Sequence, residues 1–220
     1  MIIKAAIFDV DGTLLDSMGQ WHTVAYRYMK SIGVQADEHI GNELFALTVN
    51  QAASYIIDEY NLSRTIEEVV EGMNKIVKDF YENEVVPKPG AKELLEAFKK
   101  HNIPMVVGTS TDRHCIEAGL NRLGLMDYFD RIFTCSEVGK AKSEPDLFLQ
   151  AMAFMGSKPE ETVVFEDGLY SIKTADSLGL ITVGVFDEVS RADQNEIKKI
   201  VDFYISDEMS LKEFNRTWER

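Results

Sequence analysis

The chain has 220 residues, 45% hydrophobic and 27% charged, which is typical of a globular protein with one large domain or a core plus a smaller insert. The formal net charge of −14 argues against nucleic acid and anionic membranes as partners, since both favour basic patches. We find no apolar run of 18 residues, no signal peptide and no Cys-x-x-Cys motif, so we expect a cytoplasmic protein with reduced cysteines.

The first predicted element is a buried strand over Ala5–Phe8, an apolar run that ends in Asp9, Asp11 and Gly12. In an open α/β sheet, ligands bind at the carboxyl ends of the strands. Two carboxylates two residues apart would share one face of a continuing strand, and could hold a hard cation or supply a nucleophile beside a general acid/base. Taken alone, the same residues are equally typical of a turn after a strand.

Residues 17–87 contain helical patterns and no strand between them. They predict a helix that begins near Trp21, a second helix over 42–60, and a third that begins with a capping box at Thr65. A doubly wound sheet normally returns to a strand after one helix, so this stretch is predicted to be an inserted helical module. Trp21 could face a ligand, although core packing is the more common role of a tryptophan.

After residue 90 the patterns of strands and helices alternate, which predicts a parallel sheet covered by helices. Strands are predicted at 105–108, 131–134, 162–165, 181–185 and 203–205, and a last helix at 209–214.

Polar residues follow several of these strands. Thr109 and Ser110 could hydrogen-bond an anion beside a helix start, although residues of this type also serve as helix caps. Lys142 could carry a positive charge over the strand ends, although an isolated lysine is usually a surface residue. Glu166 and Asp167 follow a later strand with a glycine behind them, which repeats the pattern of the opening strand.

The segment from Asp9 to Thr13, followed in order by Thr109, Lys142 and Glu166-Asp167, resembles the four signature motifs of the haloacid dehalogenase superfamily. The helical insert and the segment 142–146 resemble its β-phosphoglucomutase-like phosphatase branch, and the resemblance spans essentially the whole chain. It implies an α/β fold with two parts. A Rossmann-like parallel sheet core would comprise 1–16 and 88–220, and an inserted, mobile helical cap would comprise 17–87.

The resemblance also implies a Mg²⁺-dependent phosphatase that hydrolyses a small phosphate monoester, a sugar phosphate or a nucleotide, through an aspartyl-phosphate. The expected partner is thus a small phosphorylated metabolite, and the expected state is a monomer. The implied catalytic residues are Asp9, Asp11 and Lys142, the substrate-binding residues Thr109, Ser110, Lys142 and Trp21, and the metal ligands Asp9, Asp11, Glu166 and Asp167.

Two other functions use similar residues. Mutases of this branch carry a cap histidine where this chain has Trp21, with His22 one residue later, and a cap arginine that has no counterpart in 43–60. These differences favour a phosphatase over a sugar-phosphate mutase. A non-enzymatic phosphoacceptor or phosphate-binding module would use the same aspartate, threonine and lysine, but it would need no helical insertion.

Overall fold

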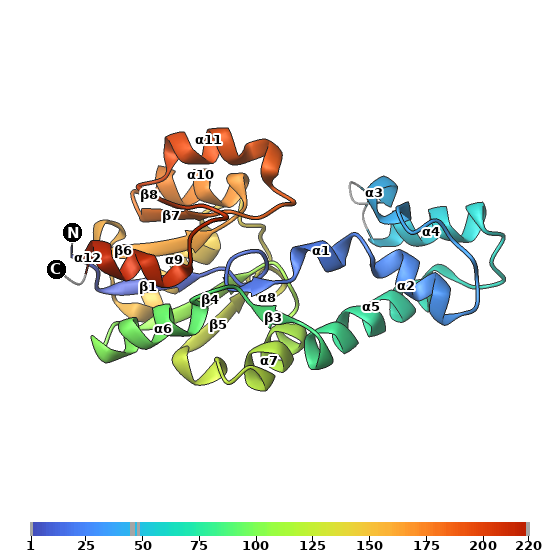
Figure 1. Ribbon diagram of the computed structural model, residues 1–220, viewed down its shortest axis with the longest axis horizontal. Coiled ribbons are helices and arrows are strands. Elements are labelled where there is room, and N and C mark those ends of the chain that lie inside the picture. The colour runs from blue at the N-terminus through green and yellow to red at the C-terminus, as the bar shows by residue number, and fades with distance from the viewer. Residues whose placement is uncertain (1, 45–46, 48, 219–220) are drawn as a thin grey trace. The chain divides into compact units, whose positions relative to one another are not determined.

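Six parallel strands form the main sheet of the computed structural model, which describes residues 2–44, 47 and 49–218 (Figure 1). Their order across the sheet is β5-β4-β1-β6-β7-β8. Their bounds are β1 Ala5–Phe8, β4 Met105–Thr109, β5 Arg131–Thr134, β6 Thr162–Glu166, β7 Ile181–Val185 and β8 Phe203–Ile205. The predicted α/β fold is confirmed. Each predicted strand is also confirmed, and only β4 and β6 differ from their predicted bounds, by one additional residue at the carboxyl end.

Helices cover this sheet on both faces, as parallel strands require. On one face, Ile7 and Val164 pack in a buried cluster with Leu147 of α9 and Ala175 of α10. The helices of this part are α6 Ala91–Lys100, α7 Arg113–Arg122, α8 Cys135–Val138, α9 Asp146–Met155, α10 Leu169–Ser177, α11 Gln194–Ile200 and α12 Asn215–Trp218.

Aromatic side chains fill the opposite face, since neighbouring residues of a strand point to opposite sides. Phe8 of β1 stacks on Phe165 of β6, with ring centroids 4.7 Å apart. Phe98 of α6 packs edge-on against Phe8 at 5.7 Å, and Phe214 packs edge-on against Phe165 at 5.0 Å. Full burial of an aromatic ring of this kind contributes roughly 2–3 kcal/mol, so these rings fix the strands that carry the acidic residues.

The tail differs from its prediction. The sequence predicts a last helix over 209–214, but residues Leu211–Phe214 form a 3-10 helix (η4), and α12 follows it. The Leu211 amide donates to the Pro89 carbonyl oxygen at 2.9 Å, and the ring of Trp218 lies 4.8 Å from that of Phe98. These long-range contacts determine where the helical turns begin, and the local sequence pattern does not predict such contacts.

The described residues of the insertion form five helices: α1 Met18–Trp21, α2 Val24–Ser31, α3 Ile40–Leu44, α4 Val49–Glu59 and α5 Ile66–Asn83. The predicted capping box is confirmed, because Thr65 Oγ1 accepts from the Glu68 amide at 3.2 Å and the Glu68 carboxylate accepts from the Thr65 amide at 2.8 Å. Helices α2 and α4 both pack against α5. The insertion is therefore a helical module, as its sequence indicates.

Two predicted helices of the insertion are wrong in extent. The helix expected to run on from Trp21 is broken before α2, where Thr23 bonds back to the Gln20 carbonyl oxygen. The helix expected over 42–60 is represented by α3 and α4, and residues 45, 46 and 48 lie outside the described part. At Gly41 of α3 an added Cβ would lie 1.6 Å from the His22 carbonyl oxygen, so only glycine permits this backbone contact.

The chain divides into two compact units, residues 1–17 with 85–220 and residues 18–84. In the larger unit, β2 Leu15–Asp16 and β3 Val86–Pro87 pair as antiparallel strands. The roles of catalytic core for 1–16 with 88–220 and of cap for 17–87 stay a prediction.

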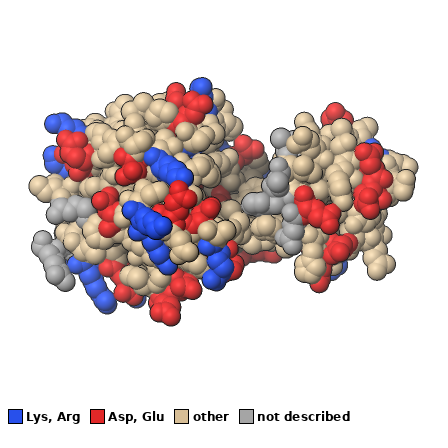
Figure 2. Space-filling view, turned by 90° about the horizontal axis from the view of Figure 1, so that it is seen from above, with Lys and Arg blue, Asp and Glu red and all other residues tan. Residues whose placement is uncertain are grey.

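Acidic side chains are exposed on both units, in agreement with the net charge of −14 (Figure 2). Within the described residues, no helix combines the length and the apolar character that a membrane span requires.

Candidate active site

The predicted acidic residues emerge at one edge of the sheet. Strand β1 lies between β4 and β6, and Phe8 pairs in register with Val107 on one side and Phe165 on the other. Asp9 therefore leaves β1 level with Glu166 at the end of β6, and Asp167 follows directly. A slip of one residue would turn these acids to the other face of the sheet, so the packing of the strands determines the site.

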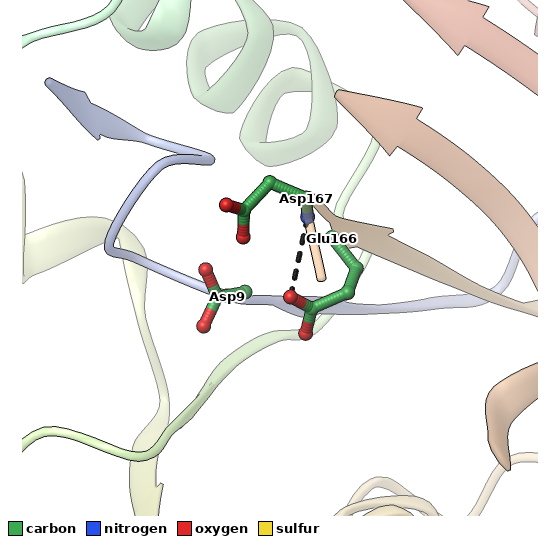
Figure 3. Close-up of side chains that lie close together, drawn as sticks. All are labelled: Asp9, Glu166 and Asp167. Atoms are coloured by element: carbon green, nitrogen blue, oxygen red, sulfur yellow. Dashed lines mark hydrogen bonds between the residues drawn. The ribbon is translucent and has the colours of Figure 1, made fainter. Parts of the chain in front are cut away.

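Three of the acidic side chains form a buried group (Figure 3). Asp9, Glu166 and Asp167 each place a carboxylate oxygen within 4.8 Å of the others. Burial, followed by the charge of Glu166, raises the pKa of Asp9 to about 7. Burial and the charge of Asp9 likewise raise the pKa of Asp167 well above its usual range. The group thus holds more negative charge than its surroundings stabilise.

Lys142 supplies a positive charge to this group from the loop before α9. Its ammonium donates to Asp9 Oδ1 and, at 2.9 Å, to Glu166 Oε2, and only 2% of its side chain is exposed. Burial alone would lower the pKa of Lys142, but the Asp9 and Glu166 carboxylates outweigh burial and raise it above its usual range. Lys142 is therefore charged at every physiological pH.

Glu166 is held by hydrogen bonds on both of its oxygens. Oε1 accepts from the backbone amides of Asp167 at 3.2 Å and Gly168 at 3.1 Å. Oε2 accepts from Lys142 and, at 2.7 Å, from the Ser171 hydroxyl. These four donors hold the Glu166 carboxylate in a fixed orientation. Glu166 is thus well suited to orient Lys142 toward Asp9.

Asp11 lies in a tight turn after β1. Gly12 has φ of 83°, a conformation that favours glycine, and its amide donates to the Leu15 carbonyl oxygen at 3.0 Å. The Ser17 hydroxyl donates to Asp11 Oδ1 at 2.6 Å and orients the carboxylate. Among the described residues, the group within 4.8 Å does not include the Asp11 carboxylate, and the role of Asp11 as a metal ligand stays a prediction.

Thr109 and Ser110 lie at the end of β4, next to β1. Thr109 is buried, and its hydroxyl oxygen accepts from the Thr111 amide at 3.1 Å. Ser110 is exposed, and its hydroxyl lies 3.5 Å from Cys135 Sγ at the end of β5. The two hydroxyl groups thus belong to the same edge of the sheet as the acids, as the sequence predicts.

Trp21 belongs to the smaller unit, where it ends α1 and is half-buried. Its contact with a substrate stays a prediction. Sequence reasoning assigned no role to Ser17 and Ser171, although each fixes a carboxylate of the site. A serine a few residues after a strand-end acid, where the chain turns back, is the signal that could have identified both.

The carboxylate group fits a hard divalent cation, which prefers oxygen ligands. Asp9 Oδ2 is buried and accepts no hydrogen bond from any described residue. A buried carboxylate oxygen without a donor is costly, and a cation would stabilise it. The raised pKa values of Asp9 and Asp167 have the same causes, burial first and the charges of the neighbouring carboxylates second.

Comparisons with known proteins identify the family of this chain. Residues 6–185 match the haloacid dehalogenase-like hydrolase family. The fructose-1-phosphate phosphatase of Escherichia coli is 31% identical over 81% of this chain and 94% of its own length. The phosphorylated carbohydrates phosphatase of Thermotoga maritima is 25% identical over 81% of this chain and 82% of its own length. The crystal structure of CbbY from Rhodobacter sphaeroides in complex with phosphate covers 97% of this chain and 96% of its own, with a TM-score of 0.76 at 22% identity.

The chain therefore belongs to the haloacid dehalogenase-like hydrolase family. Within that family it is a hydrolase of the phosphatase branch, as the sequence motifs predict.

Proposed function

We propose that this enzyme is a Mg²⁺-dependent phosphatase that hydrolyses a small organic phosphate monoester through an aspartyl-phosphate. The observation that carries the proposal is the state of Asp9. One of its oxygens is bound by Lys142, and the other is buried without a donor among the described residues. A carboxylate that is oriented on one side and unoccupied on the other is suited to act as a nucleophile.

In the first step, an Asp9 oxygen attacks phosphorus, and the bond from phosphorus to the substrate's leaving oxygen breaks. Asp11, held by Ser17, donates the proton that the leaving oxygen requires. Lys142 stabilises the negative charge on the phosphoryl oxygens, with Thr109 and Ser110 as further donors at the same edge. Glu166 keeps Lys142 in place for this role.

In the second step, Asp11 takes a proton from water, which attacks phosphorus and releases Asp9 and phosphate. The residues that would hold Mg²⁺ are Asp9, Asp11, Glu166 and Asp167, and the cation would reduce the repulsion between the Asp9 carboxylate and the phosphate. The enzyme is thus regenerated with Asp9 ionised beside Lys142.

A sugar phosphate is the substrate class that the relatives favour. The two relatives named above act on phosphorylated carbohydrates and on fructose 1-phosphate. A nucleotide is the other small phosphate monoester that the proposed chemistry accommodates.

The test is phosphate release from a panel of sugar phosphates and nucleotides, with Mg²⁺ and after its removal by a chelator. We expect turnover that is lost on chelation and recovered with Mg²⁺. Asp9→Asn should reduce kcat by at least about 10³-fold, since it removes the nucleophile. Asp176→Asn is the matched control, because Asp176 is an exposed aspartate of α10 and should leave kcat unchanged.

An Asp9→Asn variant as active as the parent would refute the nucleophile. Conversion of a sugar 1-phosphate to its 6-phosphate without phosphate release would identify a mutase instead. A phosphorylated Asp9 that persists without turnover would identify a non-enzymatic phosphoacceptor.

A further inference from the structure

A further buried aspartate lies at the edge of the sheet that carries the candidate site. Strand β7 pairs with β6, and Gly184 is in register with Glu166. Asp187 follows β7 and is 5% exposed. After burial, Asp9 and Glu166, the charge of Asp187 also contributes to the raised pKa of Asp167. Asp187 is therefore close enough to affect the electrostatics of the site.

Lys88 neutralises this aspartate. Its ammonium donates to Asp187 Oδ2 at 2.9 Å and to the Phe186 carbonyl oxygen at 2.7 Å. The exposed fractions of the two side chains are 14% for Lys88 and 7% for Asp187, so solvent screens the pair weakly. The other oxygen, Asp187 Oδ1, accepts from the Val189 amide at 3.0 Å. The carboxylate is thus held on both oxygens.

The backbone also fixes Lys88 relative to the loop that follows β1. The Lys88 amide donates to the Leu14 carbonyl oxygen at 2.8 Å, directly after the pairing of β2 with β3. The same residue therefore connects the segment after Asp11 with the segment after β7. One end of the ion pair is thus anchored to the segment after Asp11, and the other end follows β7, the strand that pairs with the Glu166 strand β6.

We propose that Lys88 is a positioning residue of this site, which fixes the Asp187 carboxylate and cancels its charge. The inference rests on the proposed function, because it concerns two binding affinities of the same site, one for a divalent cation and one for a phosphate. Asp9, Asp11, Glu166 and Asp167 already place four buried carboxylates opposite the single ammonium of Lys142. One more uncompensated carboxylate would attract the cation and repel the phosphate.

Two single variants should therefore shift ligand binding in opposite directions. Titration calorimetry of Mg²⁺ alone, and of inorganic phosphate at saturating Mg²⁺, measures both affinities without turnover. In Lys88→Met we expect tighter Mg²⁺ and weaker phosphate binding, each on the order of tenfold. In Asp187→Asn, which leaves the positive charge uncompensated, we expect weaker Mg²⁺ and tighter phosphate binding.

Three further variants separate this effect from a general loss of structure. The double variant Lys88→Met/Asp187→Asn should return both affinities to within about threefold of the parent, because charges are removed in a balanced pair. Lys88→Arg should retain both affinities. Lys173→Met is the matched control, since it breaks an exposed ion pair with Glu196 of 2.6 Å and should change neither.

A purely structural Lys88 would give a different result. Its removal would weaken both ligands together, or change only the unfolding temperature, and either outcome overturns the proposal. Should Lys88→Met fail to fold, Asp187→Asn and the double variant still decide, since unchanged affinities in Asp187→Asn also overturn it. A parent protein that binds no Mg²⁺ would refute the proposed function. If the parent binds both ligands and the variants have the same affinities as the parent, only the role of Lys88 is refuted.

Discussion

The fold places the Asp9 side chain where its ionised form is electrostatically unfavourable. Asp9 is 6% exposed and its carboxylate lies close to Glu166 and Asp167, so its charged form is disfavoured despite the contact with Lys142. The pKa of Asp9 is raised from 3.8 to about 7 by burial first and by Glu166 second. Any ligand that brings positive charge to Asp9 Oδ2 would relieve this cost.

The raised pKa predicts a pH dependence of stability in the metal-free protein. Between about pH 4 and pH 7 the folded protein holds a proton on Asp9 that the unfolded chain has released, so stability falls as the pH rises through this window. Asp9→Asn removes this loss. The free energy of unfolding of Asp9→Asn minus that of the parent should therefore increase by roughly 2 kcal/mol between about pH 5 and about pH 8.

Urea unfolding of both proteins in the presence of a chelator measures this difference. Asp9→Asn also removes the Asp9 charge that raises the pKa of Asp167, and the resulting fall in that pKa changes the stability difference in the same direction. Parallel stability curves for the parent and Asp9→Asn across this pH range would contradict the assignment.

The packing of α9 against strand β4 determines where this helix lies. A Cβ added at Gly108 would lie 2.7 Å from Leu147 Cδ2 and 3.2 Å from Ile7 Cγ2. Leu147 is completely buried, so its side chain has no space to move away. Glycine is therefore required here for close packing of the helix on the sheet. Because α9 follows Lys142 by a few residues, this packing also supports the position of the ammonium.

Gly108→Ala should destabilise the protein by roughly 1–3 kcal/mol, the usual cost of overpacking a core. We also expect a lower kcat, since displacement of α9 would move Lys142 away from Asp9. Gly19→Ala is the matched control, because an added Cβ there meets no described atom within 4 Å apart from its chain neighbours and the backbone of its own helix. Thermal unfolding and kcat of both variants test the prediction, and equal stabilities would contradict it.

The strands were predictable because each is a short apolar run that ends in polar residues. Their parallel arrangement then places Asp9, Thr109 and Glu166 at one edge, so much of the candidate site follows from the sequence as well. The breaks in the helical insertion were not predictable. The break before α2 accompanies the close approach of Gly41 to His22, a contact between residues of different helices that leaves no mark on the local apolar pattern.

The residues that support the site were missed for a related reason. Ser171 reaches back to Glu166 across five residues, and Lys88 meets Asp187 across 99. Only the folded backbone brings such partners together. An isolated lysine or serine in the sequence is typical of the surface, and nothing in its neighbours indicates that it will be buried.

Net charge is the property of the whole molecule that bears on its kinetics. The formal charge of −14 produces a field that repels a phosphate monoester before it reaches the site. Salt screens exposed charges over a Debye length of about 10 Å at 0.1 M ionic strength. The encounter with substrate should thus be faster at higher ionic strength.

At saturating Mg²⁺, kcat/KM should rise about two- to fivefold when potassium chloride is increased from about 10 mM to about 150 mM. The kcat value should stay constant, because the bound complex is already formed at saturating substrate. A kcat/KM that falls with salt would mean that local positive charge, from Lys142 and its neighbours, dominates the approach of the substrate.

The contact between Lys142 and Asp9 joins residues that are 133 positions apart in the chain. During synthesis the aspartate is made long before the lysine that will accompany it, and Glu166 is made later still. No chain that stops before Glu166 can assemble this site. A ligand that requires all three residues therefore binds only a folded chain in which they have come together, and by mass action it stabilises that state.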